Sequence, residues 1–282
     1  MNKNNEKWFC EFYSPGSGFQ MKVNEHLAHE KSPFQVIDMY RTEDFGIVMA
    51  LDDMVMVTER NEYAYHEMLI HVPLLAHPNP KQVLVVGGGD CGSLREIIKH
   101  PSVERAVQVE IDPVVVELSK KYYNWVNPTL ANSKVELIIG DALDYVKSTA
   151  NKFDVVIVDS SDPIGPAEGL FREPFYRDVF RILNDDGIVS SQLGSPFFHA
   201  KEIGELITMY RKIYPIAGLY TTYTPEYPSG LWGLGVASKQ IDPTRLSSSE
   251  RYEAVRESLR YYNPRVHHAA FVLPEYIRQQ IG

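Results

Sequence analysis

The sequence is poor in several features that would assign it to a class of protein directly. It contains only two cysteines, Cys10 and Cys91, too few for a disulfide framework or a metal cluster. It has no apolar run of membrane-spanning length, and residues 1–6 lack the apolar core of a secretory signal. Repeats and low-complexity segments are also absent. We therefore expect a cytoplasmic protein that does not engage a membrane and holds no metal.

Positive charge is scarce as well. The 28 lysines and arginines are outnumbered by 37 acidic residues, so the formal net charge is −9. This balance argues against a nucleic-acid partner and is compatible with a cationic ligand. With 282 residues, 44% of them hydrophobic and 23% charged, the chain suits one large globular domain and a smaller one.

The most informative segment is a glycine-rich turn after a short aliphatic run. Residues 83–86 predict a buried parallel strand, and Gly87, Gly89 and Gly92 follow the pattern G-x-G-x-x-G at the start of a helix. Glu110 ends the next apolar run about twenty residues later, where an acid commonly binds ribose hydroxyls. The order strand, glycines, helix and acid predicts a nucleoside site. The alternative is a turn that only lets helix and strand pack closely.

Asp90 is unusual for a turn that binds a dinucleotide. Its carboxylate stands where a pyrophosphate would lie against backbone N–H groups at a helix N-terminus. A ligand with a cationic amine would be favoured there and an anionic one repelled. Helix capping is the other explanation for an aspartate at this position, and both roles can hold together.

The chain divides into a β-rich beginning and an alternating remainder. Short strands are expected at residues 20–23, 34–40 and 46–51. A helix is expected to open at Thr58 as its cap. We predict an antiparallel β domain over residues 1–57 and a catalytic domain over residues 58–282, in which alternating strands and helices indicate a parallel α/β sheet.

Acidic residues follow the later strands at their carboxyl ends, where ligands gather in open α/β sheets. Asp141 follows the run 135–139 and is expected either to accept a hydrogen bond from an adenine amino group or to cap a helix. Asp159 and Asp162 follow the run 153–158 in a loop rich in proline and glycine. A turn role before a proline is an alternative for Asp162, whereas Asp159 has no comparable structural explanation.

These segments together resemble the polyamine aminopropyltransferase family, with spermidine synthases as its most similar bacterial members. The resemblance runs nearly end to end and is most specific in four blocks, Thr58 to Met68, Gly87-Gly88-Gly89-Asp90, Asp159 to Pro166 and Tyr227-Pro228-Ser229-Gly230. It implies a Rossmann-like, methyltransferase-type sheet with a small N-terminal antiparallel β domain. It also implies a homodimer or homotetramer.

The resemblance implies transfer of an aminopropyl group from decarboxylated S-adenosylmethionine, a co-substrate, to putrescine, with no further cofactor. Asp159 matches the residue proposed to deprotonate the attacking amine. The positions that match donor contacts are Gln35, Gly87, Gly89, Asp90, Glu110, Asp141 and Ala142. Those that match amine contacts are Tyr65, His66, Asp90, Asp162, Gln192 and Tyr227. Those that match a loop closing over the ligands are Pro163, Ile164, Gly165, Pro166 and Ala167.

Some positions depart from the family pattern, and they are Asp53, Met56, Asn61, Cys91, Ser93 and Gly194. Gly194 stands where an acid is frequent, so another acceptor amine (cadaverine, agmatine or spermidine) stays open. A methyltransferase would share the glycine turn and Glu110, but the carboxylate of intact S-adenosylmethionine is disfavoured near Asp90. A non-catalytic relative that binds polyamines or nucleosides is the third alternative.

Overall fold

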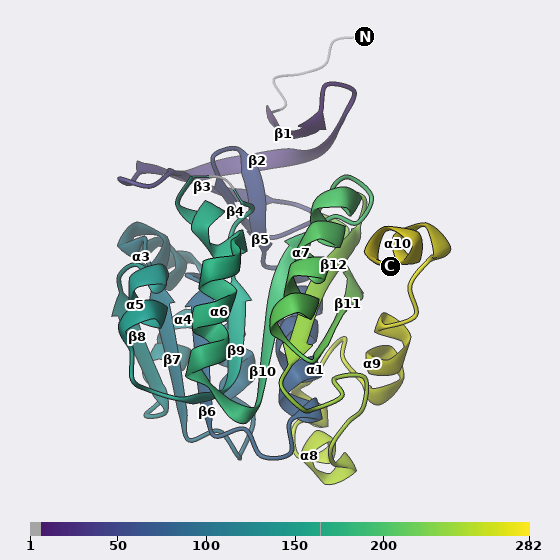
Figure 1. The fold of residues 1–282 in the computed structure, drawn as a ribbon. Coiled ribbons are helices and arrows are strands. Elements are labelled where there is room, and N and C mark those ends of the chain that lie inside the picture. The colour runs from purple at the N-terminus through teal and green to yellow at the C-terminus, as the bar shows by residue number, and fades with distance from the viewer. Residues whose placement is uncertain (1–6, 164) are drawn as a thin grey trace.

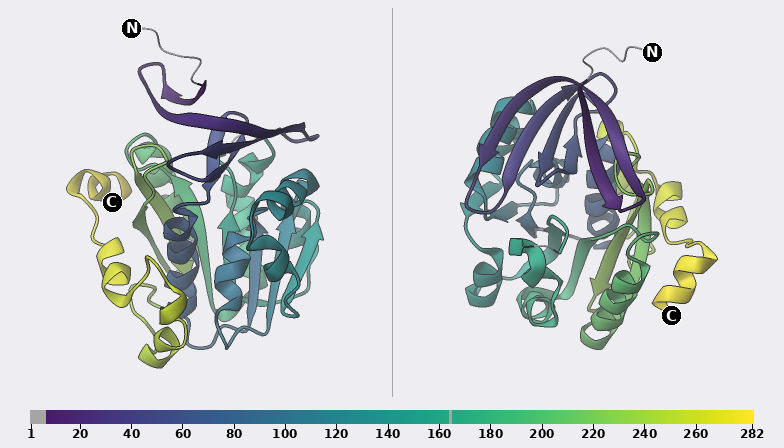
Figure 2. Two further views of the ribbon diagram at one scale, coloured as in Figure 1. Left: turned by 180° about the vertical axis from the view of Figure 1, so that it is seen from behind. Right: turned by 90° about the horizontal axis from the view of Figure 1, so that it is seen from above.

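The computed structural model describes residues 7–163 and 165–282, whose strands form two sheets. The first is antiparallel, in the order β1-β2-β3-β4-β5. Its strands are β1 (Lys7–Ser14), β2 (Ser17–Lys31), β3 (Val36–Thr42), β4 (Ile47–Leu51) and β5 (Met54–Thr58). It lies across one end of the second sheet and fans out over it when seen from above (Figures 1 and 2).

The sequence prediction was incomplete for this sheet. The expected strands at 34–40 and 46–51 correspond to β3 and β4, and 20–23 is only a part of the long β2. The strands β1 and β5 were not expected. The expected cap at Thr58 is wrong, because Thr58 ends β5 and helix α1 (Glu62–Ala76) begins after Asn61. The Thr58 hydroxyl donates to side-chain oxygens of Asn61 and Glu226, whereas an N-cap hydroxyl would accept from a backbone N–H of the helix.

The second sheet has the strand order β11-β12-β10-β9-β6-β7-β8. The strands β10, β9, β6, β7 and β8 run parallel, whereas β12 and β11 are antiparallel additions at one edge. Their bounds are β6 (Gln82–Gly87), β7 (Arg105–Glu110), β8 (Val135–Ile139), β9 (Phe153–Asp159), β10 (Leu183–Gly194), β11 (Ile216–Tyr223) and β12 (Leu231–Ser238). The predicted Rossmann-like, mostly parallel fold with an N-terminal antiparallel sheet is confirmed.

Helices cover both faces of this sheet because its central strands are apolar on both sides. On one face lie α1, α2 (Gly92–Ile98), α3 (Pro113–Tyr122), α4 (Val126–Leu130) and α9 (Pro264–Ala270). On the other lie α5 (Ala142–Ser148), α6 (Glu173–Ile182), α7 (Ala200–Ile213) and α10 (Glu275–Ile281). The remaining helices are α8 (Ser249–Glu253) and the 3₁₀ segments η1 (Gly165–Phe171) and η2 (Arg256–Ser258). Among the described residues no helix is both long and apolar enough to cross a bilayer.

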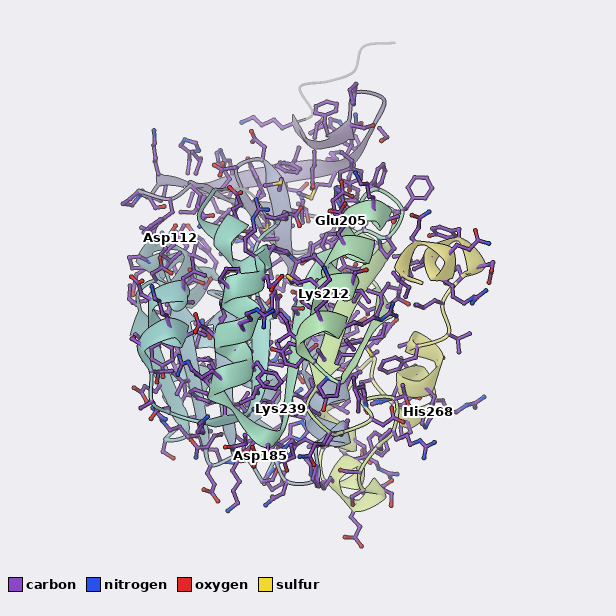
Figure 3. The ribbon with its side chains drawn as sticks, in the orientation of Figure 1. Asp112, Asp185, Glu205, Lys212, Lys239 and His268 are labelled. Atoms are coloured by element: carbon purple, nitrogen blue, oxygen red, sulfur yellow. The ribbon has the colours of Figure 1, made fainter. Side chains whose placement is uncertain are left out.

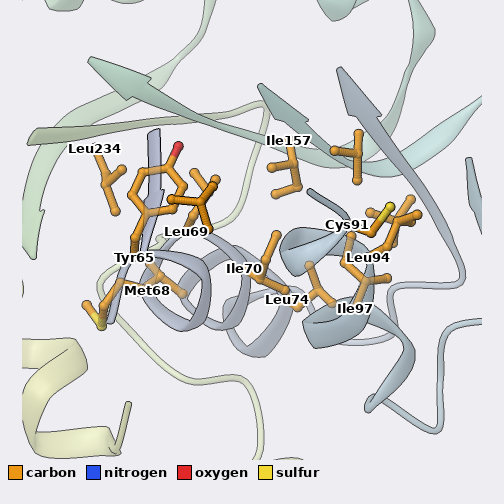
Figure 4. Packing of buried hydrophobic residues seen from close by; sticks show 14 of the residues in the cluster. Tyr65, Met68, Leu69, Ile70, Leu74, Cys91, Leu94, Ile97, Ile157 and Leu234 are labelled. Carbon is orange, nitrogen blue, oxygen red and sulfur yellow. The ribbon is translucent and has the colours of Figure 1, made fainter. Parts of the chain in front are cut away.

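Helix α1 is buried along almost its whole length, which is unusual for a helix at the face of a sheet. Its Leu69, Ile70 and Leu74 pack toward α2 and the sheet, where Ile97 and Ile157 meet them (Figure 4). A helix that is apolar on most sides needs such surroundings. This burial fixes the position of Tyr65 and His66 on its first two turns.

One carboxylate joins the two sheets. Asp112 caps α3 through a 3.0 Å hydrogen bond from the Val114 amide and also accepts from Ser32 and Gln35 of the N-terminal part, at 2.6 Å and 2.9 Å. Figure 3 shows it just below the N-terminal strands. Asp112 is fully buried, so these charge-assisted hydrogen bonds hold the N-terminal sheet in place over the parallel sheet.

Candidate active site

A cavity of about 240 Å³ lies between the N-terminal sheet and the carboxyl ends of the parallel strands. Strand β6 is flanked by β7 on one side and β9 on the other, so the chain reverses its winding direction between β6 and β9. In open α/β sheets this point creates a crevice for ligands. Gly87 and Asp159 are paired at the ends of these two strands and both line the cavity.

The glycine turn after β6 needs glycines because of its backbone conformation and the close approach of neighbouring atoms. Gly87 has φ +81°, and a Cβ on it would lie 2.3 Å from the Asp159 carbonyl oxygen. A Cβ on Gly92 would lie 2.3 Å from the His66 ring. The turn therefore brings the start of α2 against both β9 and α1, and a ligand can approach its backbone closely.

Asp159 ends β9 and is buried at the centre of the site. Its Oδ1 accepts a 2.7 Å hydrogen bond from the Tyr65 hydroxyl, and its Oδ2 accepts a 2.6 Å hydrogen bond from the Ser93 hydroxyl. Burial raises the pKa of Asp159 above its usual range, and the two hydroxyls act in the opposite direction. A carboxylate with a raised pKa and fixed geometry is suited to accept a proton.

His66 lies between two carboxylates. Its Nδ1 is 2.7 Å from Glu62 Oε2, and its Nε2 is 3.3 Å from Asp90 Oδ1. Arg95 binds both oxygens of Glu62, at 2.9 Å and 2.7 Å, and so keeps Glu62 ionised. Burial opposes the charged form of His66, but Asp90 and Glu62 outweigh this effect and raise its pKa well above the usual value. The chain thus places an imidazolium beside Asp90.

Asp90 also accepts a 2.7 Å hydrogen bond from the Gly92 amide. A local hydrogen bond at the helix start is thus present, although Asp90 is not the N-cap residue, and the carboxylate also lines the cavity. Its contact with a ligand stays a prediction. The N-cap position itself is occupied by Cys91, at φ +59°.

Another part of the cavity is formed by Glu110, Asp141, Ala142 and Gln35. Glu110 ends β7, and burial raises its pKa to about 7. Its Oε1 accepts a hydrogen bond from the Asp112 amide at 2.9 Å. Asp141 caps α5 by accepting from the Leu143 amide at 2.7 Å and still borders the cavity. Both roles considered for Asp141 therefore remain compatible.

A second part of the cavity combines acids with an aromatic wall. The rings of Tyr65, Tyr227 and Trp232 follow one another, with centroid distances of 5.9 Å and 4.7 Å. Burial raises the pKa of Asp162 above its usual range and that of Glu11 to about 7. Aromatic faces and carboxylates together favour a ligand that has methylene groups and positive charge.

The structure brings nearly all the predicted site residues to this one cavity. Its lining includes Gln35, Tyr65, His66, Gly87, Gly89, Asp90, Glu110, Asp141, Ala142, Asp159, Asp162, Gln192 and Tyr227. Gly165 and Ala167 of the predicted closing loop also line it, Pro163 is exposed and Pro166 belongs to η1. Ile164 lies outside the described residues. The individual roles stay predictions.

Sequence reasoning missed Glu11 and Trp232, which line the cavity, and Ser93, a buried residue that donates to Asp159. Glu11 comes from β1, and its carboxylate accepts from the Val55 amide at 3.0 Å. No local sequence pattern indicates that Glu11 lies at the cavity, because its position depends on how the two sheets pack together. Ser93 could have been suspected from its position one residue after Gly92. Trp232 follows the Tyr-Pro-Ser-Gly block closely and is the second residue of β12.

Two departures from the family pattern have local explanations. Asn61 donates a short hydrogen bond to the buried carboxylate of Glu226, where an aspartate would add a second negative charge. Asp53 has φ +63° in the tight turn between β4 and β5, a conformation that aspartate tolerates better than most residues. Neither change removes a group from the cavity.

Comparisons with known proteins agree with this arrangement. Residues 62–249 match the family described as spermine/spermidine synthase domain, and residues 7–59 match the spermidine synthase tetramerisation domain. The chain is 47% identical to a polyamine aminopropyltransferase of Thermoanaerobacter pseudethanolicus over 97% of this chain and 98% of that protein. It is 43% identical to the polyamine aminopropyltransferase of Shouchella clausii, over 97% and 98% of the two chains.

Two solved structures are similar over the whole fold. A spermidine synthase in complex with the transition-state analogue AdoDATO has a TM-score of 0.94 and 39% identity, over 98% of this chain and 94% of that one. The spermidine synthase of Thermotoga maritima has a TM-score of 0.93 and 38% identity over the same fractions.

Proposed function

The chain belongs to the spermine/spermidine synthase family of aminopropyltransferases, and on this premise we propose that it is a spermidine synthase. The reaction transfers the aminopropyl group of decarboxylated S-adenosylmethionine to putrescine and yields spermidine and methylthioadenosine. Both substrates are cations. The observation that carries the proposal is the gathering of carboxylates in one cavity that also has an aromatic wall: Glu11, Asp90, Glu110 and Asp159 are buried, and Asp162 is partly buried.

On the donor side, Glu110 accepts hydrogen bonds from the two ribose hydroxyls, and Asp141 with Ala142 borders the adenine. The ammonium of the aminopropyl group pairs with Asp90. An intact S-adenosylmethionine would bring its own carboxylate to the same place and would be repelled. Asp90 is therefore the residue that selects the decarboxylated donor.

On the acceptor side, Asp159 takes a proton from the attacking nitrogen of putrescine. An alkyl ammonium has a pKa near 10, as lysine does, so it arrives protonated and cannot attack until it loses a proton. The neutral nitrogen then forms a bond to the methylene next to the sulfonium. The carbon–sulfur bond breaks, its electron pair goes to sulfur, and neutral methylthioadenosine leaves without needing an acid.

The rigid side chains of the site contribute to the reaction by aligning the two substrates. Tyr65 and Ser93 fix the Asp159 carboxylate by one hydrogen bond to each oxygen. The aromatic wall holds the methylene chain of the diamine, and the distal ammonium lies toward Asp162 and Glu11. Glu11 thus offers a carboxylate in place of the acid that is frequent at the position of Gly194. Holding nucleophile and electrophile in line is a large part of catalysis in such displacements.

We propose further that the chain assembles as a homo-oligomer through its N-terminal sheet. The match of residues 7–59 to a tetramerisation domain supports this. Trp8 and Phe12 on β1 are 53% and 78% exposed, as expected for apolar side chains that meet another subunit.

The test is a transfer assay with purified protein and labelled donors. Decarboxylated S-adenosylmethionine should support transfer to putrescine, and S-adenosylmethionine should not. Cadaverine, agmatine and spermidine, offered at equal concentration, should give lower kcat/KM than putrescine. Transfer of methyl from S-adenosylmethionine would replace the proposal by a methyltransferase, and preference for another amine would change the acceptor only.

A further inference from the structure

The strand β2 contains an irregularity that places two histidines on one side of the N-terminal sheet. Residues three apart in a regular strand point to opposite faces. The pairing of β2 with β3 shifts between His26 and Ala28, so His26 lies opposite Tyr40 while His29 lies opposite Asp38. The extra residue, Leu27, is a β-bulge, and bulges re-aim the side chains next to them. His26 and His29 therefore share one face.

That face also carries Asp38, and the three side chains converge. His26 Nε2 is 2.6 Å and His29 Nδ1 is 2.8 Å from the same oxygen, Asp38 Oδ1. Asp38 is buried, while the histidines have side-chain exposures of 40% and 64%. The His26 ring is stacked on Tyr40 with a centroid distance of 4.7 Å, so its orientation is fixed. The cluster thus consists of one fixed, buried carboxylate and two imidazoles on the solvent side.

Other histidine–carboxylate clusters occur in the described part of the chain, and the hydrogen bonds of their histidines speak against metal binding. His66 has a carboxylate on each ring nitrogen, so both nitrogens carry protons. His77 accepts from the Asn79 amide through Nδ1 at 3.1 Å, which leaves the proton on the nitrogen that faces Asp154 and Asp186. In contrast, His26 and His29 each face Asp38 with one ring nitrogen. That nitrogen can offer its lone pair to an ion beside Asp38 while the other ring nitrogen keeps the proton.

We propose that His26, His29 and Asp38 bind a divalent transition-metal ion of the zinc class, with water as the remaining ligand. Two imidazole nitrogens and one carboxylate oxygen form a donor set that zinc uses. Tetrahedral ligand atoms at zinc lie about 3.4 Å apart, given bonds of about 2.0–2.1 Å. The three ligand atoms all lie within 4.8 Å of one another, and rotation of the half-exposed imidazoles opens the needed space. The ion would clamp the bulged part of β2 to β3.

This site was not expected from the sequence, because a His-x-x-His spacing on a strand puts its histidines on opposite faces. The prediction of no metal rested on the scarcity of cysteines and did not consider the histidines of β2. The proposed ion lies on the N-terminal sheet and plays no part in the transfer reaction.

The test uses tag-free protein stripped with a chelator and titrated calorimetrically with Zn²⁺. One ion should bind per chain, and Co²⁺ should give the visible absorption of a four-coordinate site. His29→Gln should weaken Zn²⁺ binding about tenfold or more, and Asp38→Asn should do the same. His268→Gln, at an exposed histidine on α9 (Figure 3), is the matched control and should bind as wild type does.

Zn²⁺ should also raise the thermal midpoint of the wild type and of His268→Gln, and leave that of His29→Gln unchanged. His29 is largely exposed, so this variant folds and the comparison is valid. The proposal is overturned if stripped wild-type protein shows no saturable Zn²⁺ binding, or if binding survives His29→Gln and Asp38→Asn undiminished. Aminopropyl transfer by His29→Gln should equal that of the wild type.

Discussion

Two regions of this molecule that hold buried carboxylates, the cavity and the interface of α1 with α2, differ in what balances the charge of their acids. At the helix interface, Glu96 is fully buried and lies 2.9 Å from His71, 2.8 Å from Arg95 and 2.6 Å from Lys99. Burial alone would raise its pKa, but these partners hold it well below the usual range. In the cavity, burial raises the pKa of Glu11 and Glu110 to about 7.

The comparison teaches that burial alone does not decide how an acid behaves. At the helix interface the chain supplies its own cations, and the network serves stability. For Glu11 and Glu110 in the cavity desolvation dominates, which costs folding energy and suits the cationic substrates proposed above. We therefore expect the acid at the helix interface to act in stability and the acids of the cavity to act in function. Four substitutions test this contrast.

The largest effect is expected for Asp159→Asn in the cavity. Loss of a general base typically lowers kcat by about 10²–10⁴-fold, and the amide keeps the shape of the side chain. Part of the deficit should return at higher pH, because more of the amine then arrives deprotonated. The measurement is a pH–rate profile at saturating donor.

Calorimetric titration of the donor is the control for Asp159→Asn, and donor affinity should be nearly unchanged. Asp162→Asn should instead raise the KM for putrescine more than it lowers kcat. A kcat close to that of the wild type in Asp159→Asn would reverse the roles of the two acids.

Glu96→Gln should destabilise the protein by about 1.5–3 kcal/mol, because the partly buried Arg95 and Lys99 each lose a charged hydrogen-bond partner. The measurement is chemical denaturation at pH 7. Glu275→Gln, which breaks an exposed ion pair with Arg278, serves as the matched control and should leave the denaturation midpoint unchanged. Equal stability of Glu96→Gln and wild type would mean that the helix-interface charges do not stabilise the fold.

Glu110→Gln should stabilise the folded protein, which is the opposite of the effect expected for Glu96→Gln. The folded protein holds a proton on Glu110 up to about pH 7, whereas the unfolded chain releases it near pH 4.5. Wild-type stability therefore falls relative to the variant as pH rises through this window, by an amount on the order of 3 kcal/mol at pH 8. The variant should be the more stable protein at pH 8 and gain little at pH 4.

Thermal midpoints across this pH range measure the effect of Glu110→Gln. The glutamine carbonyl can keep the hydrogen bond from the Asp112 amide, so the fold is not otherwise disturbed. Donor affinity should fall about tenfold or more, since a hydrogen bond to a charged group is worth about 1.5–3 kcal/mol. Unchanged donor affinity would remove Glu110 from the ribose site.

The smallest effect is expected for Ser93→Ala. The serine hydroxyl stabilises the ionised form of Asp159, so its loss should raise the pKa of that carboxyl and move the acidic limb of the kcat profile to higher pH. At pH values well above this acidic limb, kcat should be unchanged. Ser93→Thr keeps a hydroxyl and should restore the wild-type profile. If neither variant moves the limb, Asp159 is not the titrating base.

The parts that sequence could predict are those whose position follows from strand order. Asp141, Asp159 and Glu110 follow strands of a parallel sheet, and the carboxyl ends of such strands meet at one edge, so their convergence was predictable. Glu11 was not, because it reaches the cavity from a different sheet whose placement depends on contacts such as those of Asp112. The strands β1 and β5 were missed for a related reason, since β1 is largely exposed and lacks a continuous apolar pattern.

The division of the cavity between two sheets has an evolutionary consequence. In the function proposed above, Glu110 and Asp141 face the donor from the carboxyl ends of parallel strands, whereas Glu11 reaches the acceptor side from β1. The β1–β2 hairpin already contains a pairing irregularity between Phe12 and Ser14, close to Glu11. A shift in this hairpin would move Glu11 relative to Asp159 without touching the nucleoside contacts. Under the proposed function, relatives that differ in this hairpin should differ in the length of the amine they accept while their donor contacts stay the same.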